Sequence, residues 1–481
     1  MNFMVKKPQL IARKDECEQL ADCLSSDRSE FVTVCGRRRI GKTFLVDQFF
    51  NGVYDFSFVG GHKLSTRTQL HNFSKALKEY SGKMPEPITN WIEAFDALQD
   101  YLSTLPNDRK KIIFIDEMPW IDTQRSDFVD ALENFWNGWA NRRYDIVLIA
   151  SGSATSWMAN KLHENQGGLH NRITTRIFLK PFTLKETEEY LLSRNFKWDR
   201  YQMLICYMFT GGVPFYLSLM KPRYSIAQNI DKLFFTERGA LRYEFDELYN
   251  ALFPQAESYI KIVGLLYNHK GGLTRKEISK HMKFNGQRLN TILGNLMQCH
   301  FISKRAIFGN PDEAIYQLTD FYTLFYFKFN EHIKEGNEDW WCSHLDSQES
   351  LSWMGLAFEQ ICISHHRQIK KALEIGGVAT SVYAWNCKGT KGENTDGAQI
   401  DMIIERADRI LHLCEMKFSR NEYTITKQYE DALRKRVAIF QNKTETKYAL
   451  LNTFVTTYGV LDGVHKSIVD AEITMDDLFN S

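Results

Sequence analysis

Short apolar runs alternate with longer amphipathic stretches in the first part of the chain. Continuous apolar runs of strand length lie at 31–35, 54–59, 111–115, 145–150 and 177–179. Between them, apolar residues recur at helical spacing over 10–25, 43–49, 68–105 and 128–140. Continuous apolar runs are typical of strands buried on both faces. Strands that alternate with helices predict an α/β core built on a parallel sheet.

Helix signals follow from residue 183 onward. Thr183-Leu-Lys-Glu186 fits a capping box, in which the threonine and glutamate side chains bond each other's backbone N–H. Gly211 and Gly212 are expected to end a helix, and Pro214 to begin the next one at its first turn. The stretch up to about residue 250 is therefore expected to be helical.

The pattern after residue 250 predicts three helices followed by a hairpin. Helices are expected at 259–267 and 287–299, with a capping box and hydrophobic staple at 273–278 starting the helix between them. Strands at 302–307 and 314–318 would pair around the turn Gly-Asn-Pro-Asp. This is the order of a winged helix, whose third helix can enter the DNA major groove. Many winged helices mediate only protein contacts, so both uses remain open.

Composition limits the class of protein but does not select a function. The 481 residues are 43% hydrophobic and 25% charged, which is typical of a globular chain of about three domains. A net charge of +1 provides no bulk attraction to nucleic acid or membrane. No signal peptide or membrane-spanning run is evident, which predicts a cytoplasmic protein without a membrane partner. The nine dispersed cysteines indicate reduced thiols and argue against a zinc site.

The segment 36–43 carries the first candidate chemistry. It fits the phosphate-binding pattern Gly-x-x-x-x-Gly-Lys-Thr, between an expected strand and an expected helix. Its residues are Gly36, Arg37, Arg38, Arg39, Ile40, Gly41, Lys42 and Thr43. Such a loop curls round a phosphate with its amide N–H groups inward; the lysine would reach the β- and γ-phosphates and the threonine would hold Mg²⁺. ATP and Mg²⁺ are thus the expected cofactors; the alternative is a glycine-rich turn with a solvated basic tip.

Two carboxylates end the apolar strand that begins at residue 111. In a nucleotide site, Asp116 would bind Mg²⁺, and Glu117 would orient and deprotonate the water that attacks the γ-phosphate. An ordinary acidic turn after a strand is the alternative. Taken together with the loop upstream, this pair predicts ATP hydrolysis.

Further candidates lie at the end of the next strand and in the loop after it. Ser151 and Ser153 could sense the γ-phosphate there, although a plain turn at a strand end would look the same. Arg172 follows Gly167-Gly-Leu-His-Asn and could stabilise developing charge on the transferred phosphoryl group, in cis or from a neighbouring subunit. A surface arginine is the alternative.

These motifs resemble the AAA+-related signal-transduction (STAND) ATPases of archaea and bacteria. The resemblance rests on 36–43, Phe114-Ile-Asp-Glu117, Ser151-Gly-Ser153, Gly168-Leu-His-Asn-Arg172 and Gly211-Gly-Val-Pro214, and spans about 8–235. It implies a P-loop ATPase core followed by a helical lid, with Arg172 as a finger and Pro214 at the nucleotide. His-Asn replaces the usual Tyr-Gly before Arg172. Ala12 stands where a glycine is usual, which could alter contacts to adenine.

A second candidate site lies near the C-terminus. Strands at 399–405 and 410–417 are expected to pair antiparallel through a turn at 406–409, which would bring Asp401 beside Glu415. Lys417 projects on the same face as Glu415 and would orient a water or steady a phosphate. Glu359 lies on the apolar stripe of the preceding helix, where a carboxylate needs a partner such as a metal. The alternative is a set of solvated ion pairs.

The order of these residues resembles the PD-(D/E)xK nuclease superfamily, in the form attached to the ATPases named above. The resemblance implies metal binding by Glu359, Asp401 and Glu415, and catalysis by Glu415 and Lys417. The expected domains are an ATPase core at 1–182, a helical lid at 183–250, a winged helix at 251–330 and a nuclease-like α/β domain at 345–481.

Two hypotheses about function follow. In the first, ATP turnover is coupled to a metal-dependent nuclease-like domain that acts on DNA. In the second, the chain is a nucleotide-driven switch or regulator that binds DNA or protein without cutting it. Both allow a homo-oligomer or a regulatory protein partner.

Overall fold

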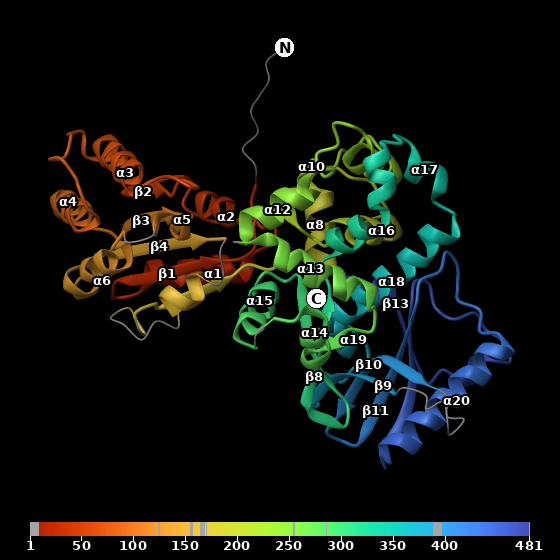
Figure 1. Ribbon diagram of the computed structural model, residues 1–481. Helices are drawn as coiled ribbons and strands as arrows, with labels where there is room; N and C mark the ends of the chain where they lie inside the picture. The colour runs from red at the N-terminus through yellow and green to blue at the C-terminus, as the bar shows by residue number, and fades with distance from the viewer. Residues whose placement is uncertain are drawn as a thin grey trace. The chain divides into compact units, whose positions relative to one another are not determined.

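The computed structural model describes residues 9–123, 126–153, 157–163, 169, 171–253, 255–284, 286–387 and 397–480 (Figure 1). The chain divides into two compact units, Met1–Lys180 and Pro181–Ser481. None of the helices within the described ranges is long and apolar enough to cross a membrane. All nine cysteines are free thiols.

The first unit is built on a parallel sheet, as the sequence predicts. Its strands are β1 (Glu30–Cys35), β2 (Phe56–Val59), β3 (Lys111–Asp116), β4 (Ile146–Gly152) and β5 (Thr175–Phe178). Over the described residues they run in the order β2-β3-β4-β1-β5, so β1 lies between β4 and β5. The carboxyl ends of parallel strands meet at one edge of the sheet. The loop after β1 therefore lies at the same edge as the ends of β3 and β4.

Helices cover both faces of this sheet because the central strands β1, β3 and β4 are buried on both sides. They are α1 (Lys14–Ser25), α2 (Lys42–Phe49), α3 (Thr66–Ser81), α4 (Trp91–Thr104), α5 (Met118–Ile121) and α6 (Phe128–Gly138), with the short turns η1 (Ala140–Arg142) and η2 (Met158–His163). The helical stretch expected at 68–105 is two helices. Gly82, at φ 72°, caps the first, and Asn90 caps the second by accepting a hydrogen bond from the backbone of Glu93.

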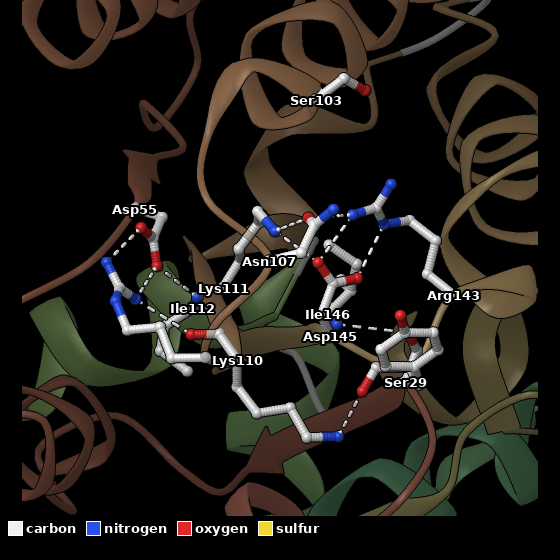
Figure 2. A network of polar contacts seen from close by, with 12 residues as sticks. Ser29, Asp55, Ser103, Asn107, Lys110, Lys111, Ile112, Arg143, Asp145 and Ile146 are labelled. Carbon is white, nitrogen blue, oxygen red and sulfur yellow. Dashed lines mark hydrogen bonds and ion pairs between the residues drawn. The ribbon is translucent and has the colours of Figure 1, made fainter.

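A polar network joins the amino ends of the strands, at the edge opposite the phosphate-binding loop (Figure 2). Asp55 forms a paired contact with Arg109, at 2.7 and 2.8 Å, and accepts a hydrogen bond from the backbone of Ile112. Lys111 is buried and forms an ion pair with Asp145. Buried charges are tolerated when they are paired and hydrogen-bonded in this way.

The second unit begins with helices and an aromatic core. Its helices up to residue 268 are α8 (Leu184–Ser193), α9 (Arg200–Thr210), α10 (Pro214–Leu219), α11 (Ile226–Ile230), the π-helical turn η3 (Asp231–Phe235), α12 (Glu244–Leu252) and α13 (Ala256–Asn268). The predicted capping box at Thr183 and Glu186 is confirmed. The predicted break is confirmed as well, because Gly211 caps α9 at φ 57° and Pro214 opens α10.

The helices and hairpin predicted after residue 250 are present. They are α14 (Arg275–Met282), α15 (Gly286–Gln298) and strands β6 (Leu273–Thr274), β7 (Ile302–Ile307) and β8 (Asn310–Leu318). Strand β8 starts at Asn310, so the hairpin turn is tighter than the expected Gly-Asn-Pro-Asp turn. Pairing of Ile307 with Asn310 after a register shift explains the earlier start. Helices α16 (Phe321–Glu335), α17 (Trp340–His344), α18 (Gln348–Ser364) and α19 (His366–Ala372) follow.

The C-terminal part adds five strands to the hairpin. They are β9 (Thr380–Cys387), β10 (Ala398–Arg406), β11 (Ile410–Lys417), β12 (Ala449–Thr456) and β13 (Ala471–Thr474), with α20 (Lys427–Thr444), η4 (Lys466–Ile468) and α21 (Met475–Leu478). In the described part of the unit, one mixed sheet runs β13-β12-β11-β10-β9-β7-β8-β6. Ile307 of β7 pairs with Ala384 of β9, so the hairpin and the C-terminal strands share one sheet.

Candidate functional site

The phosphate-binding loop has the glycines that its backbone requires. Gly41 adopts φ 90°, a left-handed conformation that side chains disfavour. A Cβ at Gly36 would lie 2.8 Å from the carbonyl oxygen of Leu179, so only glycine fits against that strand end. Helix α2 begins at Lys42, within the last two residues of the loop. The loop thus ends at a helix N-terminus, where backbone N–H groups favour an anion.

Lys42 lies against the loop that precedes it. Its side chain is 5% exposed, and its Nζ donates hydrogen bonds of 3.2 Å to the carbonyl of Gly36 and 3.4 Å to that of Arg37. These contacts hold the ammonium group within the curve of the loop. Arg37 is also buried, whereas Arg38 and Arg39 are half-buried.

Two side chains and one backbone N–H donate hydrogen bonds to the carboxylate of Asp116. Thr43 donates a hydrogen bond of 2.7 Å to Asp116 Oδ2, and Ser151 donates one to Oδ1. The backbone N–H of Glu117 also donates to Oδ1, at 2.9 Å. Thr43 and Asp116, each expected to bind Mg²⁺, therefore lie in contact. A hydroxyl and a carboxylate are oxygen donors of the kind that Mg²⁺ prefers, so these residues fit that ion.

Glu117 is held by the end of the neighbouring strand. Its backbone is left-handed, at φ 47°. Its Oε2 accepts hydrogen bonds of 2.8 Å from the hydroxyl and 3.2 Å from the backbone N–H of Ser153. Ser151 and Ser153, both expected as candidates, therefore contact different carboxylates.

Arg13 is a part of this site that the sequence interpretation did not include. It is 5% exposed and donates hydrogen bonds of 3.4 Å to the carbonyl of Ile40 and 2.8 Å to that of Lys180. It thereby fastens the phosphate-binding loop to the segment after β5. Arg13 and the preceding Ala12 both have left-handed backbones, at φ 62° and 59°. This conformation explains why a glycine suits the position of Ala12.

The roles of two other expected residues, Arg172 and Pro214, stay predictions. Arg172 is exposed, and its backbone N–H donates to the carbonyl of Leu169. Gly168 and His170, which belong to the same expected motif, lie outside the described residues. Pro214 occupies the first turn of α10 in the second unit. Their roles at the nucleotide remain predictions.

Strand pairing brings two of the expected C-terminal carboxylates to neighbouring positions. Strands β10 and β11 are antiparallel, and the pairing of Met402 with Cys414 places Asp401 across from Glu415. Lys417 lies 2.7 Å from Glu415. The two strands are joined by the predicted turn. Helix α18 carries Glu359, whose pKa responds to the charges of Asp401, Lys417 and Glu415.

Glu415 is surrounded by donors. Besides Lys417, Tyr429 donates to Oε1 and Arg436 to Oε2, both from α20. Burial opposes its charge, but Lys417 and Arg436 outweigh that effect and hold the pKa of Glu415 below its ordinary value. The sequence interpretation missed Tyr429 and Arg436. Their spacing of seven residues on one helix face is a weak signal, because many surface helices share it.

The pKa of Glu359 is shifted upward, in the opposite direction to that of Glu415. Burial raises its pKa to about 7, and the charge of Asp401 acts in the same direction. Asp401 Oδ1 accepts a hydrogen bond of 2.6 Å from Gln399 Nε2. The carboxylates fit a hard divalent cation in kind. In the described ranges, however, no three His, Cys, Asp or Glu side chains are close enough together to hold a metal, and both oxygens of Glu415 are bonded.

Comparison with known proteins supports the P-loop ATPase core that the sequence predicts. Residues 10–220 match a family described as an ATPase domain predominantly from Archaea, which confirms the resemblance to archaeal P-loop ATPases for that region. Over 454 residues the chain is 24% identical to an uncharacterized protein of Methanocaldococcus jannaschii, covering 92% of this chain and 95% of that protein.

Solved structures show a similar fold. A Walker-type ATPase of Pyrococcus abyssi has a TM-score of 0.50 at 16% identity, over 68% of this chain and 99% of that one. The ORC2 protein of Aeropyrum pernix, solved as ADPNP and ADP complexes, has a TM-score of 0.44 at 12% identity, over 70% of this chain and 96% of that one. The first of these likenesses agrees with the α/β core predicted from the sequence.

Proposed function

We propose that this chain hydrolyses ATP at the loop 36–43. The observation that carries the proposal is the convergence of Thr43, Ser151 and Glu117 on Asp116 at the end of β3, beside the helix N-terminus that follows the loop. A hydrolase of this kind needs a phosphate cradle, a metal-binding carboxylate and a group that orients water. The match of residues 10–220 to an ATPase family supports the same activity.

Each residue has a role that follows from its chemistry. Lys42 would bind the β- and γ-phosphates, and Thr43 and Asp116 would hold the Mg²⁺ that neutralises them. Glu117, oriented by Ser153, would take a proton from the attacking water. Arg172 would stabilise charge on the transferred group, in cis or from a second copy.

Phosphate release by wild type, Lys42→Ala and Glu117→Gln tests this proposal. We expect Lys42→Ala to lose nucleotide binding, and Glu117→Gln to bind ATP without turning it over. Glu79→Gln is the matched control, because Glu79 is an exposed carboxylate on α3. Equal turnover by wild type and Glu117→Gln would remove Glu117 from the mechanism.

The C-terminal carboxylates support a second activity, coupled to the first. We propose that Glu359, Asp401 and Glu415 bind a divalent metal and that Lys417 orients the water or steadies a phosphate during cleavage of DNA. The support is the position of Asp401 across from Glu415, the contact of Lys417 with Glu415, and the raised pKa of the half-buried Glu359, whose charge a cation would stabilise. This part of the chain would form a nuclease-like domain, preceded by a winged helix, in a STAND-type ATPase.

One observation favours a non-cleaving switch instead. Lys417, Tyr429 and Arg436 already bond both oxygens of Glu415. An assay of plasmid and single-stranded DNA cleavage with Mg²⁺ or Mn²⁺, with and without ATP, distinguishes a nuclease from a non-cleaving switch. Cutting that disappears in Glu415→Ala supports the nuclease, and its dependence on ATP supports coupling. Equal cutting by Glu415→Ala, or none by wild type, favours the switch.

A further inference from the structure

The backbone of Glu117 lies against the loop that follows β2. Strands β2 and β3 are parallel, and the register that pairs Val59 with Asp116 places Gly60 beside Glu117. The backbone N–H of Gly60 also donates a hydrogen bond of 2.9 Å to the carbonyl of Asp116. The loop after β2 therefore begins next to the residue proposed to activate water.

The contact between this loop and Glu117 leaves no room for a side chain at Gly60. A Cβ there would lie 2.6 Å from the carbonyl oxygen of Glu117 and 2.7 Å from a side-chain carbon of Ile121. The backbone of Glu117 is left-handed, at φ 47°. Such a conformation is costly for a residue with a side chain and persists where the surrounding structure enforces it. The loop after β2 is part of that surrounding structure.

Gln69 joins this loop to the turn after β3 through its side-chain amide. It lies in the first turn of α3 and is fully buried. Its Oε1 accepts a hydrogen bond of 3.1 Å from the backbone N–H of Gly61, and its Nε2 donates one of 2.8 Å to the carbonyl of the same residue. Nε2 donates another, of 3.0 Å, to the carbonyl of Trp120 in α5. An amide nitrogen has two N–H donors, so both are in use.

Further contacts connect the start of α3 to Glu117. The hydroxyls of Thr66, the first residue of α3, and Thr123 form a hydrogen bond of 2.6 Å. The backbone N–H of Trp120 donates a hydrogen bond of 2.9 Å to the carbonyl of Glu117. The carbonyl of Glu117 is thus bonded by a residue that Gln69 binds directly.

Glu117 is therefore fixed in two places. Ser153 bonds its carboxylate, and the segments that Gln69 joins hold its backbone. The side-chain hydrogen bonds of Gln69 within the described residues go to Gly61 and Trp120, and neither of these belongs to the phosphate-binding loop 36–43. Loss of the amide should therefore disturb Glu117 and leave the phosphate cradle in place.

We propose that Gln69 is a positioning residue for ATP hydrolysis. It fixes the loop after β2 to the turn after β3 and so holds Glu117 in the backbone conformation from which its carboxylate reaches Ser153. The inference rests on the proposed hydrolysis of ATP and adds to it a residue that acts through Glu117 without contacting the nucleotide.

Gln69→Met tests this role, because methionine has a similar length but forms none of the three hydrogen bonds. We expect kcat for ATP hydrolysis to fall by about tenfold, since displacement of a reacting group by about 1 Å can cost on the order of 10² in rate. The Kd for Mg²⁺-ATP should not change. Phosphate release and titration with a fluorescent ATP analogue measure the two quantities. Weaker ATP binding at an unchanged kcat would overturn the proposal.

Leu77→Ala is the matched control for a general loss of stability. Leu77 is buried on the same helix and packs in the apolar core of the first unit. Its truncation should destabilise the fold, because it removes buried methyl groups and leaves a cavity. With both variants shown to be folded by circular dichroism, we expect Leu77→Ala to keep the kcat of wild type. An equal loss of kcat in Leu77→Ala and Gln69→Met would overturn the proposal.

A double variant shows whether Gln69 acts through Glu117. Residues that act as a unit have non-additive effects on rate. We therefore expect Gln69→Met to leave the residual single-turnover rate of Glu117→Gln unchanged, and a further loss would overturn the proposal. Hydrolysis by Glu117→Gln at the wild-type rate would refute the role proposed for Glu117 itself. Loss of hydrolysis in Glu117→Gln together with a normal kcat in Gln69→Met would refute only the role of Gln69.

Discussion

Thr43 donates a hydrogen bond of 2.7 Å to Asp116, although the two residues are 73 positions apart in the sequence. The contact joins the first turn of α2 to the end of β3 at the carboxyl edge of the sheet. It places a hydroxyl and a carboxylate side by side, and both would hold the proposed Mg²⁺.

Thr43→Val tests this pair. Valine keeps the shape but removes the hydroxyl, so we expect the affinity for Mg²⁺-ATP to fall by about tenfold, the effect of removing one metal ligand or its immediate partner. ATP affinity in EDTA should change much less. Titration with a fluorescent ATP analogue, with Mg²⁺ and with EDTA, measures both. Thr104→Val, at the exposed end of α4, is the control, and equal losses in both conditions would contradict the metal role of Thr43.

The buried pair at the other edge of the sheet predicts a stability effect. Lys111 is 1% exposed and pairs with Asp145, which Arg143 also contacts (Figure 2). Lys111→Met keeps the apolar stem but leaves the carboxylate with one cation. We expect a loss of about 2–3 kcal/mol in the free energy of unfolding, since breaking a buried pair leaves a poorly compensated charge. Urea unfolding measures it, with Lys78→Met on the exposed face of α3 as the control.

The same pair has a defined pH dependence. Burial by itself raises the pKa of Asp145, but hydrogen bonds from Arg143 and Lys111 hold it down at about 2. The folded pKa is below the unfolded value of about 3.9, so the stabilisation is complete above that value and is lost as the pH falls toward 2. The difference in the free energy of unfolding between wild type and Lys111→Met should therefore become smaller as the pH falls from about 5 to 2.5. A gap that stays constant would contradict the pairing.

His365 predicts pH dependence at milder acidity. Its Nε2 accepts a hydrogen bond of 3.1 Å from the backbone N–H of Leu184, which requires an unprotonated nitrogen. Burial lowers the pKa of His365 to about 4. Between that value and the unfolded value of about 6.5, the unfolded chain binds more protons, so stability decreases as the pH falls through this window.

Urea unfolding of wild type and His365→Asn at pH 7 and pH 5 measures this effect. Between pH 7 and pH 5, the free energy of unfolding should fall by on the order of 2 kcal/mol more in wild type than in the variant, because each pKa unit corresponds to about 1.4 kcal/mol. His366→Asn provides a neighbouring histidine for comparison. Equal pH dependence of wild type and His365→Asn would show that the histidine is not held neutral.

The sequence predicted well wherever a local pattern determines the backbone. The loop 36–43, the acidic end of β3 and the capping boxes at Thr183 and Thr274 all appear as expected, because each depends on residues a few positions apart. The antiparallel pairing near Asp401 was also predictable, since a short turn between two alternating strands leaves one register.

Contacts between distant segments were not predictable. Arg13 bonds the carbonyl of Lys180, 167 residues away, and Arg305 bonds that of Asp401, 96 residues away. A backbone carbonyl carries no sequence signature, so neither contact leaves a pattern to read. The pairing of Ile307 with Ala384, which joins the hairpin to the C-terminal strands, was not predicted either. Any two strand edges can pair through their backbones, so this contact also has no sequence pattern.

Arg436 supplies the last prediction, which concerns the metal proposed at the carboxylates. It bonds Glu415 Oε2 from α20, where a divalent cation would need that oxygen. Arg436→Gln removes a competing cation while leaving a polar side chain. We expect Mn²⁺ to bind this variant about fivefold more tightly than wild type, equivalent to about 1 kcal/mol for a lost ion pair. Calorimetric titration without DNA measures this, and Arg434→Gln, an exposed partner of Glu430 on the same helix, is the control. Unchanged Mn²⁺ affinity in Arg436→Gln would mean that Glu415 does not take part in holding the metal.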